Sequence, residues 1–188
     1  ISVQVKNTPV GSVVVEKVDG QDSSIKLEGV KFTLTKKDDK DFEPVTKETN
    51  AEGTITFDGL EYGTYILTEV EAPAGYVKAA AREVVVDQNK EAISVQVKNT
   101  PVGSVEVAKV DAVDGTTLAG VEFKLTKEGD KEFNQTQTTD EKGTATFKEL
   151  EYGTYTLEEV KAPNGYVLTK DSKQTIEITK AGQVEKVE

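Results

Sequence analysis

The chain has 188 residues, a formal net charge of −11, and neither cysteine nor histidine. This length allows one large domain or two small ones. The acidic balance argues against nucleic acids and anionic membranes as partners, and the lack of cysteine and histidine excludes disulfides and most metal or nucleophile sites. No apolar run approaches the length of a membrane span, so we expect no membrane span in these residues. We also expect no cofactor and no bound metal.

Two long stretches of the sequence occur twice. Ile1–Val13 returns unchanged as Ile93–Val105, and Glu52–Tyr65 closely matches Lys142–Tyr155. Repeats of this kind indicate homologous structural units that follow one another along the chain.

The repeats predict the domain boundaries. We expect one unit at residues 11–101 and a second at residues 103–188, preceded by residues 1–10 as the last strand of an earlier repeat. The junction Asn99–Gly103 is too short for a free linker, so neighbouring repeats of the same protein should be held end to end.

Short strands separated by turn residues fill the first unit, and no helical period competes with them. We predict strands at Ser12–Asp19, Val30–Lys36, Glu43–Glu48, Thr54–Phe57, Thr64–Val70, Glu83–Asp87 and Ala92–Asn99. The second unit repeats this plan with slightly shorter loops. The pattern is typical of an all-β protein made of two tandem immunoglobulin-like β-sandwich domains.

In the first unit, three apolar rows each end in a polar residue on the same face of the strand. Side chains alternate between the two faces of a strand, so these rows point into the core. The polar residues are Lys17, Glu69 and Asn99, which follow the pairs Val13/Val15, Tyr65/Leu67 and Val95/Val97. Three polar groups that converge in a small core need one another as partners.

This trio allows two interpretations. In the first, Lys17 and Glu69 form a buried ion pair and Asn99 completes the network, which fixes the strand register and adds little net stability. In the second, the dry site favours a neutral amine and a neutral carboxyl group. The amine then attacks the Asn99 carboxamide, Glu69 hydrogen-bonds the carboxamide oxygen and relays protons, and ammonia leaves. The product is an isopeptide bond between the first and last strands.

The sequence around these residues resembles a known family. Lys17 in VEKVD, the YxLxExxAPxGY box with Glu69, and Asn99 in a terminal VxVxN strand are similar to the collagen-adhesin B-type (CnaB) repeats of Gram-positive surface proteins. The resemblance implies a self-formed Lys–Asn bond, with Glu69 and Glu159 as the catalytic residues.

It also implies a function. CnaB repeats are rigid, protease-resistant stalk modules of wall-anchored adhesins or pili, on the outside of the cell. We therefore expect structural spacer repeats rather than a turnover enzyme, because each reaction consumes its own side chains. A host matrix protein would be bound through other domains. The alternatives are a module that itself binds a ligand, or a pilin subunit.

The second unit has the lysine and the glutamate, Lys109 and Glu159, but no asparagine in the expected place. Aligning the two glutamates carries Asn99 to position 189, and aligning the two lysines carries it further. We therefore predict that Lys109 is not cross-linked within the chain. Asn7, in the orphan first strand, is a candidate partner for Lys109 of another molecule by β-augmentation. The alternative is a frayed or lightly docked N-terminal segment.

Overall fold

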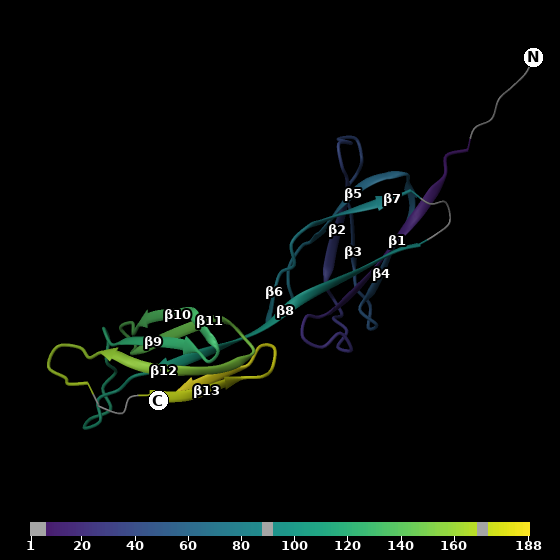
Figure 1. Cartoon of the computed structure of the whole chain (residues 1–188). Helices are drawn as coiled ribbons and strands as arrows, with labels where there is room; N and C mark the ends of the chain where they lie inside the picture. Colours follow the sequence, from purple (N-terminus) through teal and green to yellow (C-terminus); the bar gives the residue numbers. More distant parts are fainter. Residues whose placement is uncertain (1–6, 88–91, 169–172) are drawn as a thin grey trace, which may run out of the picture. The chain divides into compact units, whose positions relative to one another are not determined.

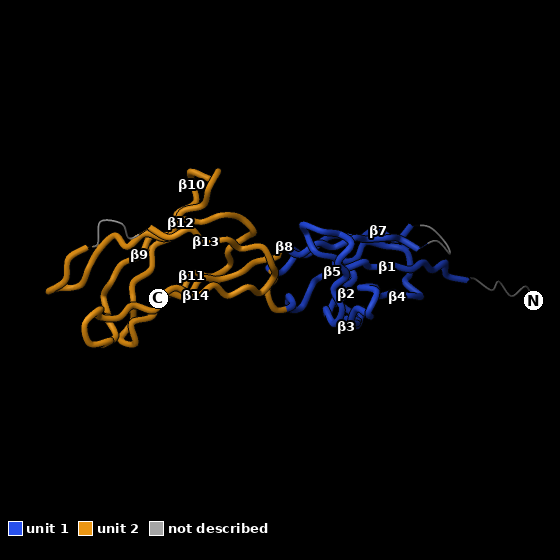
Figure 2. Tube along the Cα trace, turned by 90° about the horizontal axis from the view of Figure 1, so that it is seen from below, with its two compact units in different colours: residues 1–73, 77–100 blue, residues 74–76, 101–188 orange. Residues whose placement is uncertain are grey.

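The computed structural model describes residues 7–87, 92–168 and 173–188, and every regular element in these ranges is a β-strand (Figure 1). The chain divides into two compact units, one of residues 1–73 and 77–100 and one of residues 74–76 and 101–188 (Figure 2). None of the described residues belongs to a helix that is long and apolar enough to cross a membrane. The predicted all-β class with two tandem units is confirmed.

Unit 1 is a sandwich of two sheets. In the first sheet, β1 lies in the centre, antiparallel to β4 on one side and parallel to the start of β8 on the other. The second sheet has the order β3-β2-β5-β7. The strands are β1 (Val10–Asp19), β2 (Lys31–Lys36), β3 (Val45–Glu48), β4 (Thr54–Glu61), β5 (Gly63–Glu69), β7 (Arg82–Val86) and β8 (Ala92–Ala108).

Unit 2 repeats this arrangement around the second half of β8. That half pairs with β11 antiparallel and with β14 in parallel. The facing sheet has the order β10-β9-β12-β13. The strands are β9 (Glu122–Lys127), β10 (Asp130–Thr138), β11 (Thr144–Glu151), β12 (Gly153–Lys161), β13 (Lys173–Ile178) and β14 (Val184–Val187).

The core of each unit lies between its two sheets. It is filled by the side chains that point inward at every second position of the strands. Tyr65 and Leu67 of β5 are buried, as are Tyr155 and Leu157 of β12. Both tyrosine hydroxyls donate a hydrogen bond to a backbone carbonyl four residues earlier, at 2.8 Å in unit 1 and 2.7 Å in unit 2. A buried tyrosine needs such a partner because an unsatisfied hydroxyl is costly in the core.

Most strand boundaries lie within two residues of the sequence prediction, and three differences are larger. β4 continues to Glu61, a short strand β6 (Tyr76–Val77) is added, and β8 runs through the expected junction to Ala108. The junction stays extended because its backbone groups have partners: the Val102 N–H donates to the Gly75 carbonyl at 2.7 Å. The predicted strand in residues 1–10 falls mostly on residues 1–6, which lie outside the described residues, and residues 7–9 form no strand.

At two glycines of unit 2, backbone strain and steric clash from an added side chain can be measured separately. Gly129 and Gly143 both have a left-handed backbone, with φ of 79° and 72°. A Cβ on Gly143 would also lie 2.6 Å from the Lys109 carbonyl oxygen, whereas nothing lies within 4 Å at Gly129. We expect Gly129→Ala to lower the free energy of unfolding by roughly 1–2 kcal/mol and Gly143→Ala by clearly more. Chemical denaturation followed by circular dichroism measures both, and equal losses would contradict the predicted clash.

Candidate cross-linking site

Lys17 lies near the C-terminal end of β1 and is fully buried. It follows Val13 and Val15 on the same face of the strand, and all three side chains are 0% exposed. A lysine is almost never buried this completely without a partner, because its ammonium loses its hydration. The predicted orientation of Lys17 towards the core is confirmed.

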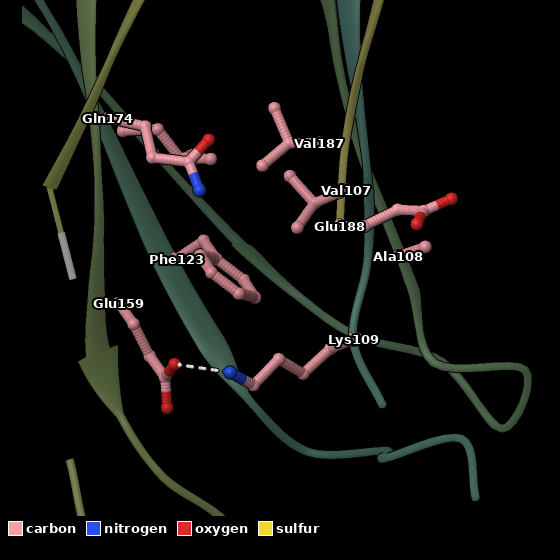
Figure 3. A pocket seen from close by; sticks show the side chains of 9 residues that line it. Val107, Ala108, Lys109, Phe123, Glu159, Gln174, Val187 and Glu188 are labelled. Carbon is pink, nitrogen blue, oxygen red and sulfur yellow. Dashed lines mark ion pairs between the residues drawn. The ribbon is translucent and has the colours of Figure 1, made fainter. Parts of the chain in front are cut away.

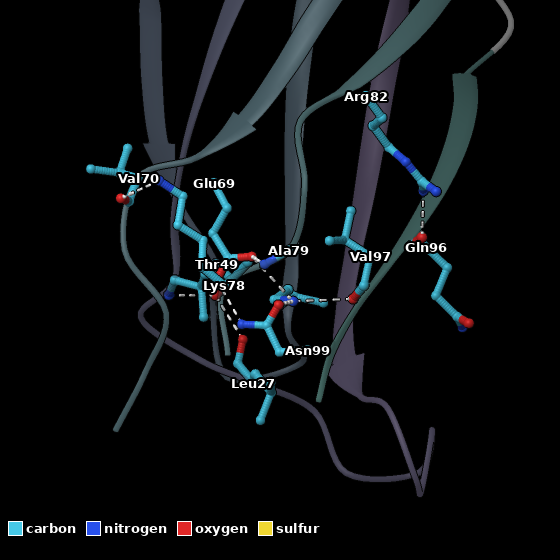
Figure 4. Close-up of polar contacts among 12 residues, drawn as sticks. Leu27, Thr49, Glu69, Val70, Lys78, Ala79, Arg82, Gln96, Val97 and Asn99 are labelled. Carbon is cyan, nitrogen blue, oxygen red and sulfur yellow. Dashed lines mark hydrogen bonds and ion pairs between the residues drawn. The ribbon is translucent and has the colours of Figure 1, made fainter. Parts of the chain in front are cut away.

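The partners of Lys17 come from the opposite sheet and from the last strand of the unit. The Lys17 Nζ donates a hydrogen bond to Asn99 Oδ1 and lies 3.5 Å from Glu69 Oε2. Asn99 Nδ2 in turn donates to Glu69 Oε1 at 2.6 Å (Figure 4). Glu69 is 1% exposed and Asn99 0%. The three residues that the sequence selected therefore form one closed, buried cluster between the sheets.

The pairing of β1 with β8 brings Lys17 and Asn99 together across 82 positions of sequence. In this parallel ladder Lys17 lies opposite Val97, and Asn99 follows two residues later on the same face. Glu69 is the last residue of β5, opposite Phe32 in the facing sheet. Each member of the cluster is thus held by a different strand.

Two backbone groups complete the site, and sequence reasoning did not identify them. The Ala79 N–H donates to Glu69 Oε2 at 3.1 Å, and the Lys17 Nζ also contacts the Val97 carbonyl oxygen at 3.4 Å. A backbone group gives no signal in the residue type, so only the folded chain reveals it. Every buried side-chain nitrogen and oxygen in the described part of the chain has a hydrogen-bond partner.

Burial changes the acidity of the lysine. Desolvation lowers the pKa of Lys17 from 10.5 to about 8, and attraction to Glu69 offsets part of this effect. A substantial fraction of the amine is therefore neutral near pH 8, and the neutral amine is the nucleophilic form.

The structure differs from the sequence-based expectation in one contact. Glu69 was expected to hydrogen-bond the carboxamide oxygen of Asn99, but it accepts a hydrogen bond from the carboxamide nitrogen instead. An ionised carboxylate only accepts hydrogen bonds, so it takes the N–H while the lysine donates to the oxygen. This contact places the carboxylate beside the nitrogen that would leave as ammonia.

Unit 2 holds the matching lysine–glutamate pair, and the carboxamide that lines its pocket belongs to Gln174 rather than to an asparagine. The Lys109 Nζ lies 3.0 Å from Glu159 Oε2, at the edge of a pocket of about 190 Å³ (Figure 3). The Lys109 side chain is 31% exposed and that of Glu159 is 6% exposed. The last asparagine of the sequence is Asn164, in the loop after β12. The sequence led us to expect a buried Lys109 amine facing Glu159. The two groups do face each other, but the lysine is open to solvent, so its expected burial is wrong.

Asn7 is not part of the Lys17–Glu69–Asn99 cluster of its own unit. It is exposed and lies before the start of β1. Its predicted partnership with Lys109 of a second molecule remains a prediction.

The lowered pKa of Lys17 predicts a pH dependence. In an Asn99→Ala variant, which keeps the Lys17–Glu69 pair but lacks the carboxamide, we expect the free energy of unfolding to rise as the pH increases from about 8 to 10. The unfolded chain keeps the lysine proton up to its ordinary pKa of 10.5, whereas the folded chain releases it near pH 8, so higher pH favours the folded state.

Urea unfolding at a series of pH values measures this effect. The control is the double variant Asn99→Ala/Lys17→Met, whose curve lacks the contribution of Lys17. Parallel curves for the two variants would show that the lysine has an ordinary pKa in the folded protein.

The same protein-family model matches both units of the chain. The model of the SpaA prealbumin-like fold domain matches residues 11–101 and again residues 103–188. Serine-aspartate repeat-containing protein D of Staphylococcus aureus (strain Newman) is 29% identical over 172 residues, which cover 79% of this chain and 13% of that protein. The chain therefore spans only a small part of this relative.

Solved structures are similar along nearly the whole chain. The Bacillus anthracis TIE protein is 34% identical, with 95% of this chain and 33% of the other covered and a TM-score of 0.49. A streptococcal ancillary pilin is 28% identical, with 97% and 62% covered and a TM-score of 0.45. Because the family model covers both units, the chain belongs to the SpaA prealbumin-like fold domain family, of which it carries two tandem copies.

Proposed function

We propose that the chain is a structural spacer segment of a Gram-positive cell-surface protein, and that unit 1 closes itself with an isopeptide bond between Lys17 and Asn99. One observation carries the chemistry: a buried lysine, carboxylate and carboxamide from three different strands are in mutual contact. An ion pair alone has no need of the carboxamide, and buried ion pairs contribute little net stability.

The reaction balances within the site. The neutral Lys17 amine attacks Asn99 Cγ, and a new C–N bond forms. Glu69 takes the proton that the attacking nitrogen loses and delivers it to Asn99 Nδ2, which it already contacts at 2.6 Å. The Cγ–Nδ2 bond then breaks and ammonia leaves. Glu69 ends the reaction as it began, so its role is proton transfer.

The reaction can occur only once in a unit. The amine and the carboxamide become one amide, so no nucleophile remains for a second cycle. The chain therefore acts on itself and is no turnover enzyme. It needs no cofactor, because the attacking group, the proton carrier and the leaving group are all side chains of the same unit.

The bond would stabilise this small domain covalently, as disulfides stabilise other small extracellular domains. The chain has no cysteine, yet Lys17 and Asn99 join the first and last strands of unit 1 across 82 positions. Closing a loop of this length stabilises the fold by about 4 kcal/mol in the chain-entropy model. A bond between these strands also keeps a pulled or nicked unit connected, which suits a stalk module.

The location and partners follow from the family and the tandem repeat. The CnaB resemblance and the relative in Staphylococcus aureus both fit a wall-anchored surface protein of a Gram-positive bacterium. In such a protein the direct partners of each unit are its neighbouring repeats. A host matrix protein would be bound by other domains, and the two units described here would hold those domains away from the wall.

Intact mass tests the bond directly. We expect the purified chain to be lighter than its sequence mass by one ammonia, because the lysine, carboxylate and asparagine carboxamide are in mutual contact in unit 1. Glu69→Ala should restore the full mass, since it removes the proton carrier, while the matched variant Glu159→Ala should retain the loss. A wild-type chain of full sequence mass would contradict the proposed bond. Ammonia loss in Glu69→Ala would contradict the role proposed for the glutamate.

Thermal unfolding tests what the bond contributes. Asn99→Ala removes the electrophile and leaves the Lys17–Glu69 pair, so unit 1 should melt lower by roughly 15–30 °C. The matched control is Asn134→Ala, at an exposed position of β10 in unit 2, where the melting temperatures should stay nearly unchanged. Calorimetry separates the transitions of the two units, and a similar small shift for both variants would contradict a stabilising cross-link.

A further inference from the structure

The loop after β12 presents an asparagine that is followed directly by a glycine, Asn164–Gly165. This is the only Asn-Gly step in the sequence, and both residues are exposed. Within the described ranges, no group forms a hydrogen bond with the Asn164 side chain or with the Gly165 N–H. A backbone nitrogen and a carboxamide, both without hydrogen-bond partners, therefore lie next to each other in the chain.

Asn164 and Gly165 occupy the two central positions of a turn. The Tyr166 N–H donates to the Pro163 carbonyl at 3.1 Å, and Gly165 has a φ of 90°, as the third residue of a type II turn does. A Cβ placed on Gly165 would have nothing within 4 Å. Glycine adds no side chain that shields its own nitrogen, and the open space around it allows the backbone to rotate towards the carboxamide.

The other asparagines in the described ranges are held or shielded. Asn99 is buried, and both ends of its carboxamide are hydrogen-bonded. Asn50 Oδ1 accepts a hydrogen bond from a backbone N–H at 2.8 Å, and Asn134 lies within β10. Asn7 is followed by a threonine, whose branched side chain crowds the next nitrogen. Asn164 thus combines exposure, an unbonded carboxamide and a following glycine.

Unit 1 carries the same loop without the reactive pair. When Gly63–Tyr76 is aligned with Gly153–Tyr166, the position of Asn164 is occupied by Ala74. An alanine at this position is therefore compatible with the loop. The Asn164→Ala variant gives unit 2 the residue that unit 1 has in the same place.

The turn positions a tyrosine that links two loops of unit 2. The Tyr166 hydroxyl donates to Asp111 Oδ2 at 2.6 Å, and Asp111 Oδ1 accepts the Val113 N–H at 2.6 Å. The loop after β12 is thereby tied to the loop after β8. Since Tyr166 is two residues from Asn164, a change in the backbone at Asn164 would displace this hydroxyl from its partner.

We propose that Asn164 is a self-modification site and that its conversion opens the turn and releases Tyr166 from Asp111. The Gly165 nitrogen loses its proton to solvent and attacks Asn164 Cγ; the Cγ–Nδ2 bond breaks, and ammonia leaves with a proton from water. Water then opens the resulting succinimide to aspartate or isoaspartate. Isoaspartate lengthens the backbone by one carbon, so the hydrogen bond from Tyr166 to Pro163 no longer closes the turn.

Ageing the purified chain in mildly alkaline buffer tests the site, because base removes the proton from the attacking nitrogen. We expect isoelectric focusing to show a growing form with one extra negative charge, and peptide mapping to place the change at residue 164. Hydroxylamine, which attacks succinimides, should cleave the chain between residues 164 and 165. Asn164→Ala should abolish both results, whereas the control Asn134→Ala should retain both.

Two measurements on the aged chain test the release of Tyr166. The Tyr166 amide should exchange hydrogen faster than in the fresh chain, while the matched loop of unit 1, residues 72–76, should be unchanged. The hydrogen bond to Asp111 raises the pKa of Tyr166 above its ordinary value. Release should therefore let Tyr166 ionise at lower pH, which ultraviolet titration against Tyr166→Phe measures.

The absence of both the acidic form and the cleavage would overturn the site. An acidic form that persists in Asn164→Ala would place the reaction at another residue. An acidic form with unchanged exchange and unchanged tyrosine titration would overturn the release of Tyr166. The bond proposed for unit 1 is tested separately, since Glu69→Ala should remove its ammonia loss and leave the reaction of Asn164 unchanged.

Discussion

The parallel pairing of β1 with β8 is the constraint on which the candidate site depends. It places the first strand of unit 1 beside the last one, so that Lys17 meets Asn99 although 82 positions separate them. Alternation along each strand then directs both side chains inward, towards Glu69 on the facing sheet. A shift of one residue in this register would turn the row to the other face and disperse the cluster.

Both units hold a lysine–glutamate pair between their sheets, and the two lysines differ in exposure. In unit 1 the last strand covers the lysine, every polar group has a partner inside the core, and burial lowers the pKa of Lys17 to about 8. In unit 2 the same lysine and glutamate are 3.0 Å apart, but the lysine keeps access to water. Burial of the Lys17 amine favours its neutral, nucleophilic form.

The polar cluster also has an energetic cost. Burying a lysine and a glutamate in a small core is nearly neutral at best when they remain ions, and a well-packed apolar group would serve the fold equally well. The cost is offset if the groups react, because a neutral amide replaces two charges and closes the chain. For a protein without cysteine, this proposed chemistry would provide a covalent closure in place of a disulfide.

The sequence by itself determined the all-β class, the tandem units and the inward direction of Lys17, Glu69 and Asn99, because side-chain alternation is a local property of an extended backbone. Only the tertiary structure decided that β8 continues through the junction, that Glu69 contacts the carboxamide nitrogen, and that the Ala79 N–H holds the carboxylate. It also decided that Lys109 is open to solvent. These features depend on which strands pair and in what register, and on backbone groups that every residue shares. The residue types alone therefore do not predict them.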